Sequence, residues 1–196
     1  MSKSQMGKKR HLVLPLLTVI FAASVGYMQL SWVAALVFTV AFGGGLALYM
    51  ATIWRVPFDA RTVLVPYLLT VIFFIVHVYE EYLTEFWTLL TTITGQEVSQ
   101  GDFLFVAAFT GPILWIAGAI LILMRTHYGD YFLCAFFFAM VIAELAHFIF
   151  PFAEHGHFHY SSGLYTAAVP LIPAGYGLYI MLRSVHHERR KFEQIS

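Results

Sequence analysis

Long apolar stretches separated by short polar segments make up most of this 196-residue chain. Each stretch can cross a hydrocarbon core, which requires roughly 20 residues. Because backbone amides in lipid have to be hydrogen-bonded within the protein, the stretches are predicted to be helices, and they lack the alternation of barrel strands. The predicted spans are residues 12–30, 31–54, 62–84, 103–124, 131–152 and 164–183. The pattern predicts an all-α, polytopic membrane helix bundle with six transmembrane helices in one domain, residues 1–196.

The composition agrees with this class of protein. Hydrophobic residues make up 60% and charged residues 11% of the chain, whereas a soluble domain is about half apolar and a quarter charged. The start, Lys8-Lys9-Arg10 before an apolar stretch, is also typical of a signal peptide. Residues 22–26 are a poor cleavage site and the apolar pattern resumes after them, so we expect the first helix to be retained.

Basic residues indicate the orientation. All 11 Lys and Arg residues fall in the two tails or in alternate connections, with Arg183 at the end of the last helix. Lys and Arg are concentrated on the cytoplasmic side of membrane proteins, so the chain is predicted to be N-in and C-in. The segments expected inside are 1–11, 55–61, 125–130 and 184–196, and those expected outside are 85–102 and 153–163.

Two polar pairs interrupt the apolar runs. Ionisable groups within a membrane cost roughly 2.5–3.5 kcal/mol each, so each needs a partner or a function. His77 can converge with Glu80 and Glu81, because residues three and four apart share a helix face. Glu144 and His147 have the same i, i+3 spacing in the fifth predicted helix. At about 1.5 Å per residue, both pairs lie roughly 20 Å from the inner ends of their helices, near the outer face.

The loop after the fifth predicted helix adds His155, His157 and His159 on the same outer side. We expect one of them, His157 first, to fold back as a ligand or lid, because Gly156 and Gly163 permit tight turns. Taken singly, each polar residue is more often a hydrogen-bonded or solvated group. Two pairs at matched depth favour a site, and adjacent carboxylates at low dielectric cannot both ionise without a cation. The set therefore predicts a metal ion or coupled protons.

At these residues the chain resembles the HXXEE-domain family, bacterial integral membrane proteins named for a His-x-x-Glu-Glu motif. That motif is intact at residues 77–81. The family's Asn-Glu-x-x-His motif is present with Ala143 in place of Asn, and its Tyr-x-Pro-Gly-x-x-Thr motif is similar to residues 160–166, with Ser162 in place of Pro. The family's histidine seven positions before that tyrosine falls on Ala153.

The resemblance implies a bacterial inner or plasma membrane, and the depth of the two polar pairs predicts a site near its outer face. It adds Tyr160 and Thr166 to His155 and His159 as residues that support the site. Enzymatic activity is suspected for the family but its function is not known, so the resemblance implies a site without naming a reaction.

A metal-dependent membrane enzyme is the function that we expect first. In a hydrolase, one zinc ion binds His77, His147 and a carboxylate from Glu81 or Glu144, and Glu80 is the general base. In an oxidase, two iron ions bind the three glutamates and the histidines and oxidise a lipid or isoprenoid with O₂. A proton- or metal-coupled transport site is the third alternative. Ligand types alone do not separate the metals, and zinc is expected before iron.

The expected partners are the lipid bilayer and an amphiphilic small molecule, such as a lipid ester or amide, because the site lies beside lipid. We expect no nucleic-acid partner. Small residues at 43–45 and 174–177 permit close helix contact, either inside the bundle or in a homo-oligomer.

Overall fold

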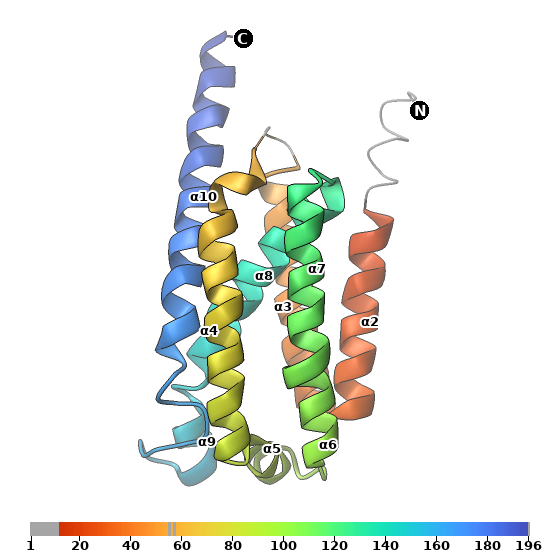
Figure 1. The fold of residues 1–196 in the computed structure, drawn as a ribbon, viewed down its shortest axis with the longest axis vertical. Helices are drawn as coiled ribbons and strands as arrows, with labels where there is room; N and C mark the ends of the chain where they lie inside the picture. Colours follow the sequence, from red (N-terminus) through yellow and green to blue (C-terminus); the bar gives the residue numbers. More distant parts are fainter. Residues whose placement is uncertain (1–11, 55, 57, 196) are drawn as a thin grey trace.

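The helices form an elongated bundle in which most of them run along one axis (Figure 1). The structure is a computed structural model that describes residues 12–54, 56 and 58–195, and these form helices and loops but no strand. The all-α prediction is therefore confirmed for the described residues. The helices along the axis are α2 (Val13–Gln29), α3 (Trp32–Ala51), α4 (Leu64–Leu83), α7 (Gly111–Leu123), α8 (His127–Ala146) and α10 (Ala168–Ile195).

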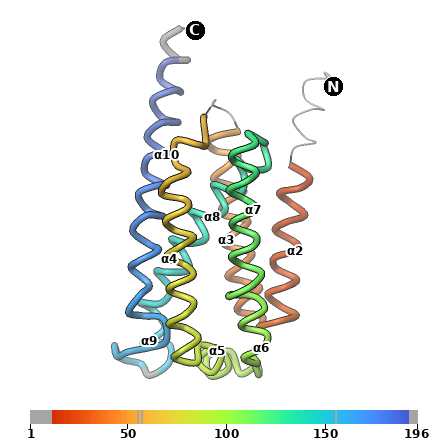
Figure 2. The backbone as a smooth tube through the Cα atoms, viewed as in Figure 1, coloured from red at the N-terminus to blue at the C-terminus, as the bar shows by residue number. Residues whose placement is uncertain are grey.

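Shorter elements lie at the two ends of the bundle (Figure 2). One end, which we call the site end, carries α5 (Phe86–Thr94), α6 (Gln100–Phe103) and α9 (Phe150–His155). The 3-10 turn η1 (Ala60–Val63) lies at the opposite end, which we call the basic end, and the π-helical stretch η2 (Leu104–Thr110) joins α6 to α7.

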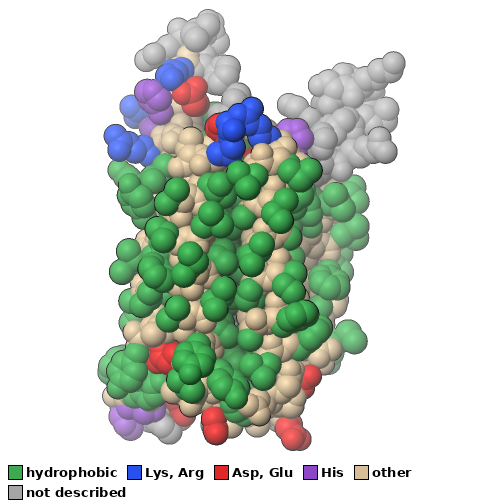
Figure 3. Space-filling view, in the orientation of Figure 1, with side chains coloured by type: hydrophobic (Ala, Val, Ile, Leu, Met, Phe, Trp, Pro, Cys, Tyr) green, Lys and Arg blue, Asp and Glu red, His purple; other side chains and the backbone are tan. Residues whose placement is uncertain are grey.

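Charge and hydrophobicity are separated along the bundle. In the view of Figure 3, Lys and Arg side chains gather at the basic end, and hydrophobic side chains form a broad belt below them. Arg61 lies in η1, Arg125 lies in the connection between α7 and α8, and Arg189 lies near the end of α10. This distribution supports the predicted orientation, and the N-in, C-in topology itself stays a prediction.

Five helical segments of the described chain are long and apolar enough to cross a membrane. Large apolar side chains on them face outward, such as Val65 and Ile172, which are 68% and 70% exposed. Such a surface indicates an integral membrane protein. The apolar helix α2 is shorter, at 17 residues, or about 25 Å, so the sixth span stays a prediction.

Two helix boundaries differ most from the predicted spans. The predicted span 131–152 ends as α8 at Ala146, because the chain turns at the site end before it begins α9. The predicted span 164–183 begins four residues later, because residues 160–166 form a loop that packs against the polar pairs. It then continues as helix through the polar tail to Ile195.

α8 lies at the centre of the bundle, in contact with α3, α7 and α10. Its residues 133–137 are completely buried. The backbones of α3 and α8 touch at Gly45, where a Cβ would lie 2.3 Å from the Cα of Ala135. Gly177 of α10 faces the ring of Phe137 at a similarly short distance. These small residues therefore serve close packing inside the bundle.

Candidate metal centre

Four ionisable side chains meet between α4 and α8 near the site end. His77 and Glu81 come from successive turns of α4, and Glu144 and His147 come from the end of α8. All four are buried, with exposed fractions between 1% for Glu144 and 6% for Glu81. The structure thus brings together the two pairs that the sequence placed at matched depth.

The ligand atoms are spaced as one metal ion requires. His77 Nε2 lies 3.1 Å from His147 Nε2 and 3.3 Å from Glu144 Oε2. Glu81 Oε1 lies 3.6 Å from the nitrogen of His77 and 3.4 Å from that of His147. A tetrahedral zinc ion with bonds of about 2.0–2.1 Å places neighbouring ligand atoms about 3.3 Å apart. His77, Glu81 and His147 could therefore hold one ion, with Glu144 beside it.

Hydrogen bonds on the far sides of the two imidazoles fix their tautomers. His147 Nδ1 lies 3.1 Å from the carbonyl oxygen of Ser162, which can only accept, so this nitrogen carries the proton. His77 Nδ1 lies 3.0 Å from Thr166 Oγ1. That hydroxyl donates its own hydrogen to Glu80 Oε2 at 2.5 Å, so it accepts from His77. In the neutral rings, both Nε2 atoms are then bare lone pairs that face each other.

Two bare nitrogens 3.1 Å apart repel unless a metal ion or a proton lies between them. Glu144 adds to this excess of acceptors, because its buried Oε2 has no hydrogen-bond partner within the described part of the chain. Buried polar atoms nearly always have a partner. Moreover, histidines that bind a metal typically donate their other N–H to an oxygen, as both rings do here. The donor set therefore fits a metal ion.

Glu80 lies outside this group and accepts four hydrogen bonds. Its Oε1 accepts from the Tyr160 hydroxyl at 2.9 Å and from the Tyr165 N–H at 3.2 Å. Its Oε2 accepts from the N–H and the hydroxyl of Thr166, at 2.7 and 2.5 Å. Partial burial raises the pKa of Tyr160, which keeps its hydroxyl protonated as a donor. These contacts occupy the lone pairs that a general base would use, so they do not favour a catalytic role for Glu80. That role stays a prediction.

Residues 160–166, which we call the lid, cover the centre at the site end. Gly163 has a φ of +82°, and a Cβ on it would lie 2.6 Å from His147 Cε1. Glycine therefore allows both the turn and the close approach to the imidazole. The hydroxyls of Thr84 and Ser162, 2.6 Å apart, tether the lid to the end of α4.

The loop histidines lie apart from the centre. His157 is exposed, and its ring centroid is 5.7 Å from that of His159, whose Nε2 is 3.6 Å from Glu154 Oε2. Neither histidine belongs to the set of ligand atoms that the described residues place within 4.8 Å of one another. The side chain of His155 lies outside the described residues. The loop does reach the centre, but the lid backbone lies against the imidazole where we expected the side chain of His157.

Two contacts at the centre had no signal in the side-chain pattern. The carbonyl oxygen of Ser162 accepts from His147, and the hydroxyl of Thr84 holds the lid. A carbonyl group is present at every residue, so only the fold selects this one. The conspicuous sequence feature here is Gly163 between Tyr160 and Thr166, which marks the segment as a tight turn.

No family model, curated protein or solved structure matches this chain. The resemblance to the HXXEE-domain family stays a prediction from its motifs, and the geometry of the centre carries the functional argument.

Proposed function

We propose that this protein is an intramembrane zinc hydrolase that cleaves an ester or amide bond of an amphiphilic lipid. The observation that carries the proposal is the convergence of the bare Nε2 atoms of His77 and His147 with the carboxylate of Glu81. Imidazole and carboxylate ligands at tetrahedral spacing suit zinc. Three protein ligands also leave a fourth position, as in catalytic zinc sites.

A single ion accounts for the donor set better than a pair of iron ions. Di-iron centres in helix bundles use four carboxylates and two histidines. Glu80 is hydrogen-bonded to the lid, which leaves two histidines with Glu81 and Glu144. This set suffices for one ion and is too small for two.

The residues divide into ligands, a proton acceptor and a cover. A bound zinc ion supplies a Lewis acid and makes a water molecule nucleophilic at neutral pH. His77, His147 and Glu81 hold the ion. Glu144 Oε2 lies 3.3 Å from His77 Nε2 and has no hydrogen-bond partner among the described residues, so it is positioned to accept a proton. The lid excludes bulk water, which strengthens electrostatic interactions inside the centre.

The site end faces the outside of a bacterial plasma membrane in this proposal. Lys and Arg gather at the opposite end, the end that the positive-inside rule assigns to the cytoplasm. The centre is surrounded by apolar helices, so its substrate reaches it from lipid and has an acyl portion.

Metal analysis of the purified protein in detergent tests the proposal, together with hydrolysis of p-nitrophenyl esters of fatty acids. We expect about one equivalent of zinc, and loss of the metal in His147→Ala and Glu81→Gln. Glu144→Gln is expected to keep zinc and fold but to lose hydrolysis, whereas the exposed control Glu97→Gln keeps all three. No metal in the wild-type protein overturns the proposal, and two equivalents of iron favour the oxidase. If the protein binds zinc but hydrolyses no ester or amide, it is a metal-binding protein and the hydrolase assignment is wrong.

Glu80→Gln separates two roles for this carboxylate. If Glu80 positions His77 through Thr166, the variant binds zinc more weakly and recovers hydrolysis in excess zinc. If Glu80 is the general base, the variant binds zinc normally and stays inactive at every zinc concentration.

A further inference from the structure

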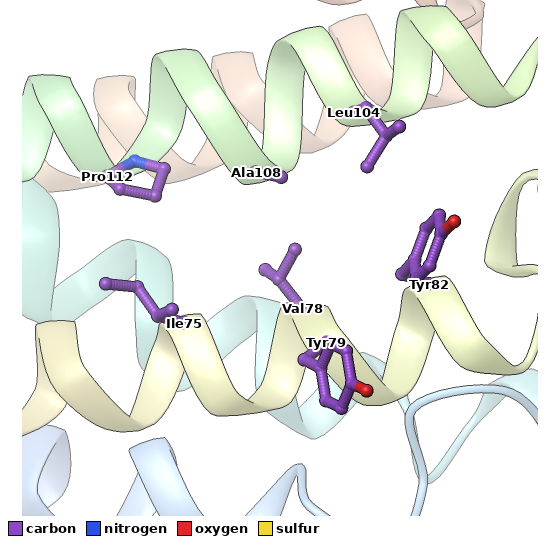
Figure 4. A pocket seen from close by; sticks show the side chains of 7 residues that line it. All are labelled: Ile75, Val78, Tyr79, Tyr82, Leu104, Ala108 and Pro112. Atoms are coloured by element: carbon purple, nitrogen blue, oxygen red, sulfur yellow. The ribbon is translucent and has the colours of Figure 1, made fainter.

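An apolar groove of about 300 Å³ runs between α4 and the η2–α7 segment on the outer surface of the bundle. Figure 4 shows Leu104, Ala108 and Pro112 directed towards α4 across this gap. The residues that line its two sides include Ile75, Val78 and Tyr82 on one helix and Leu104, Ala108 and Pro112 on the other. No charged side chain lines it.

The groove exists because the helix opposite α4 is irregular and carries a small residue at the centre of the gap. Residues 104–110 form a π-helical stretch, which is rare and frequently found at functional sites. Within it, Ala108 presents a single methyl group between the larger side chains of Leu104 and Pro112, which line the groove on either side of it. A bulkier residue at this position would fill the groove.

The groove and the metal centre use the same turns of α4. His77 and Glu81 point into the bundle, while their neighbours Val78 and Tyr82 line the groove. One apolar cluster connects the groove with the metal centre, because it contains both Val78 and Phe86. The ring of Phe86 lies 5.4 Å from the ring of His147. Apolar side chains therefore connect the groove to the centre.

The surroundings of the groove identify its occupant. Flanking side chains face the membrane belt, with Tyr79 63% and Phe109 60% exposed, so the groove opens towards lipid acyl chains. From Leu104 to Pro112 it follows the helix axis for about 12 Å, most of one leaflet of a hydrocarbon core that is about 30 Å thick. An alkyl chain aligned with the lipids has this direction and length.

We infer that the groove binds the acyl chain of the substrate, a single-chain amphiphile whose head group lies at the site end. The inference rests on the proposed hydrolase function, because it assigns the occupant to that centre and not to the bulk bilayer. Tyr82 and Leu104 lie at the end of the groove nearest the site end of the bundle, and Ile75 and Pro112 lie at its other end.

Cross-linking with a fatty-acyl ester that carries a diazirine near its methyl end tests this assignment. We expect labelled peptides to map to residues 75–82 and 104–112 of the wild-type protein. Ala108→Leu is expected to reduce the labelling about tenfold, the effect of displacing roughly two methylene groups. The control Ala117→Leu adds the same side chain at another exposed position of this helix and leaves labelling unchanged.

Competition identifies the source of the chain. Unlabelled ester of the same length should displace the probe, and an equal amount of diacyl phospholipid should not. Displacement by both to the same extent makes the occupant a bulk lipid and overturns the inference, as does labelling that maps elsewhere in the wild-type protein. Repeating the labelling with His147→Ala separates the two proposals, because the groove should still be labelled when the centre has lost its metal. If the groove of the wild-type protein is labelled but the protein contains no zinc, the hydrolase proposal is refuted and the binding of an acyl chain in the groove is not.

Discussion

Replacing Thr166 by valine tests whether the lid tunes the metal centre through the ring of His77. The hydroxyl of Thr166 accepts from His77 Nδ1 at 3.0 Å and donates to Glu80 at 2.5 Å. Valine has nearly the same shape and removes both bonds. The N–H of Thr166 still binds Glu80 at 2.7 Å, so the lid keeps most of its attachment and the change is confined to the imidazole.

The expected loss follows from what the substitution leaves behind. The Nδ1–H of His77 becomes a buried donor without a partner, which costs about 1–3 kcal/mol. Removal of an oxygen that orients a metal-binding histidine typically weakens metal binding about 10–100-fold, or about 1.4–2.7 kcal/mol. The first cost lowers the stability of the fold with or without zinc, and the second raises the zinc dissociation constant of Thr166→Val by about 10–100-fold.

Competition with a fluorescent zinc indicator in detergent micelles measures this constant, and circular dichroism checks the fold. The control is Thr84→Val, which removes the 2.6 Å contact with Ser162 but touches neither imidazole. It should bind zinc as the wild type does. Wild-type affinity in Thr166→Val would refute the argument, and equal losses in both variants would assign the effect to the tether of the lid.

Two further predictions concern the lid and the topology. Gly163→Ala should lower both the zinc affinity and the melting temperature by more than Gly156→Ala does. Both residues have a positive φ, so both variants share a backbone strain of about 1–2 kcal/mol, but only the Cβ at 163 would meet an imidazole. Equal losses in the two variants would show that the close approach to His147 is unimportant. A reporter fused after Ser196 should be cytoplasmic and one inserted near Gln96 external, and a cytoplasmic signal from the second would refute the six-helix topology.

The apolar helices could be predicted from the sequence because the membrane leaves the backbone few alternatives. The predicted span 12–30 corresponds to α2 at Val13–Gln29, for example. The π-helical stretch at 104–110 could not be predicted in this way. It packs against a neighbouring helix, where Gly111, which follows it, lies close to the ring of Phe74 of α4. The pattern of apolar residues in a sequence does not indicate such a contact.

The four ionisable residues of the centre could also be located from the sequence. His77 and Glu81 are four residues apart, and Glu144 and His147 are three apart, so each pair shares a helix face. The lid differs, because most of its contacts with these residues use backbone atoms or a glycine. We predicted instead that His157 would fold back, since a histidine in a loop is visible in a sequence and a carbonyl oxygen is not.

The adjacent glutamates of the His-x-x-Glu-Glu motif explain how one helical turn can serve two purposes. Side chains at successive helix positions leave the axis about 100° apart, and Glu81 turns to the centre while the half-buried Glu80 turns to the lid. A lipid can reach the buried ligands only if some covering segment moves. The hydrogen bonds that hold the lid to Glu80 go to a carboxylate, so each contributes about 1.5–3 kcal/mol net, and opening the lid requires that they break while His77 and Glu81 keep their places on the helix. The motif thus combines two candidate ligands, His77 and Glu81, with a residue between them in the sequence, Glu80, that holds the lid.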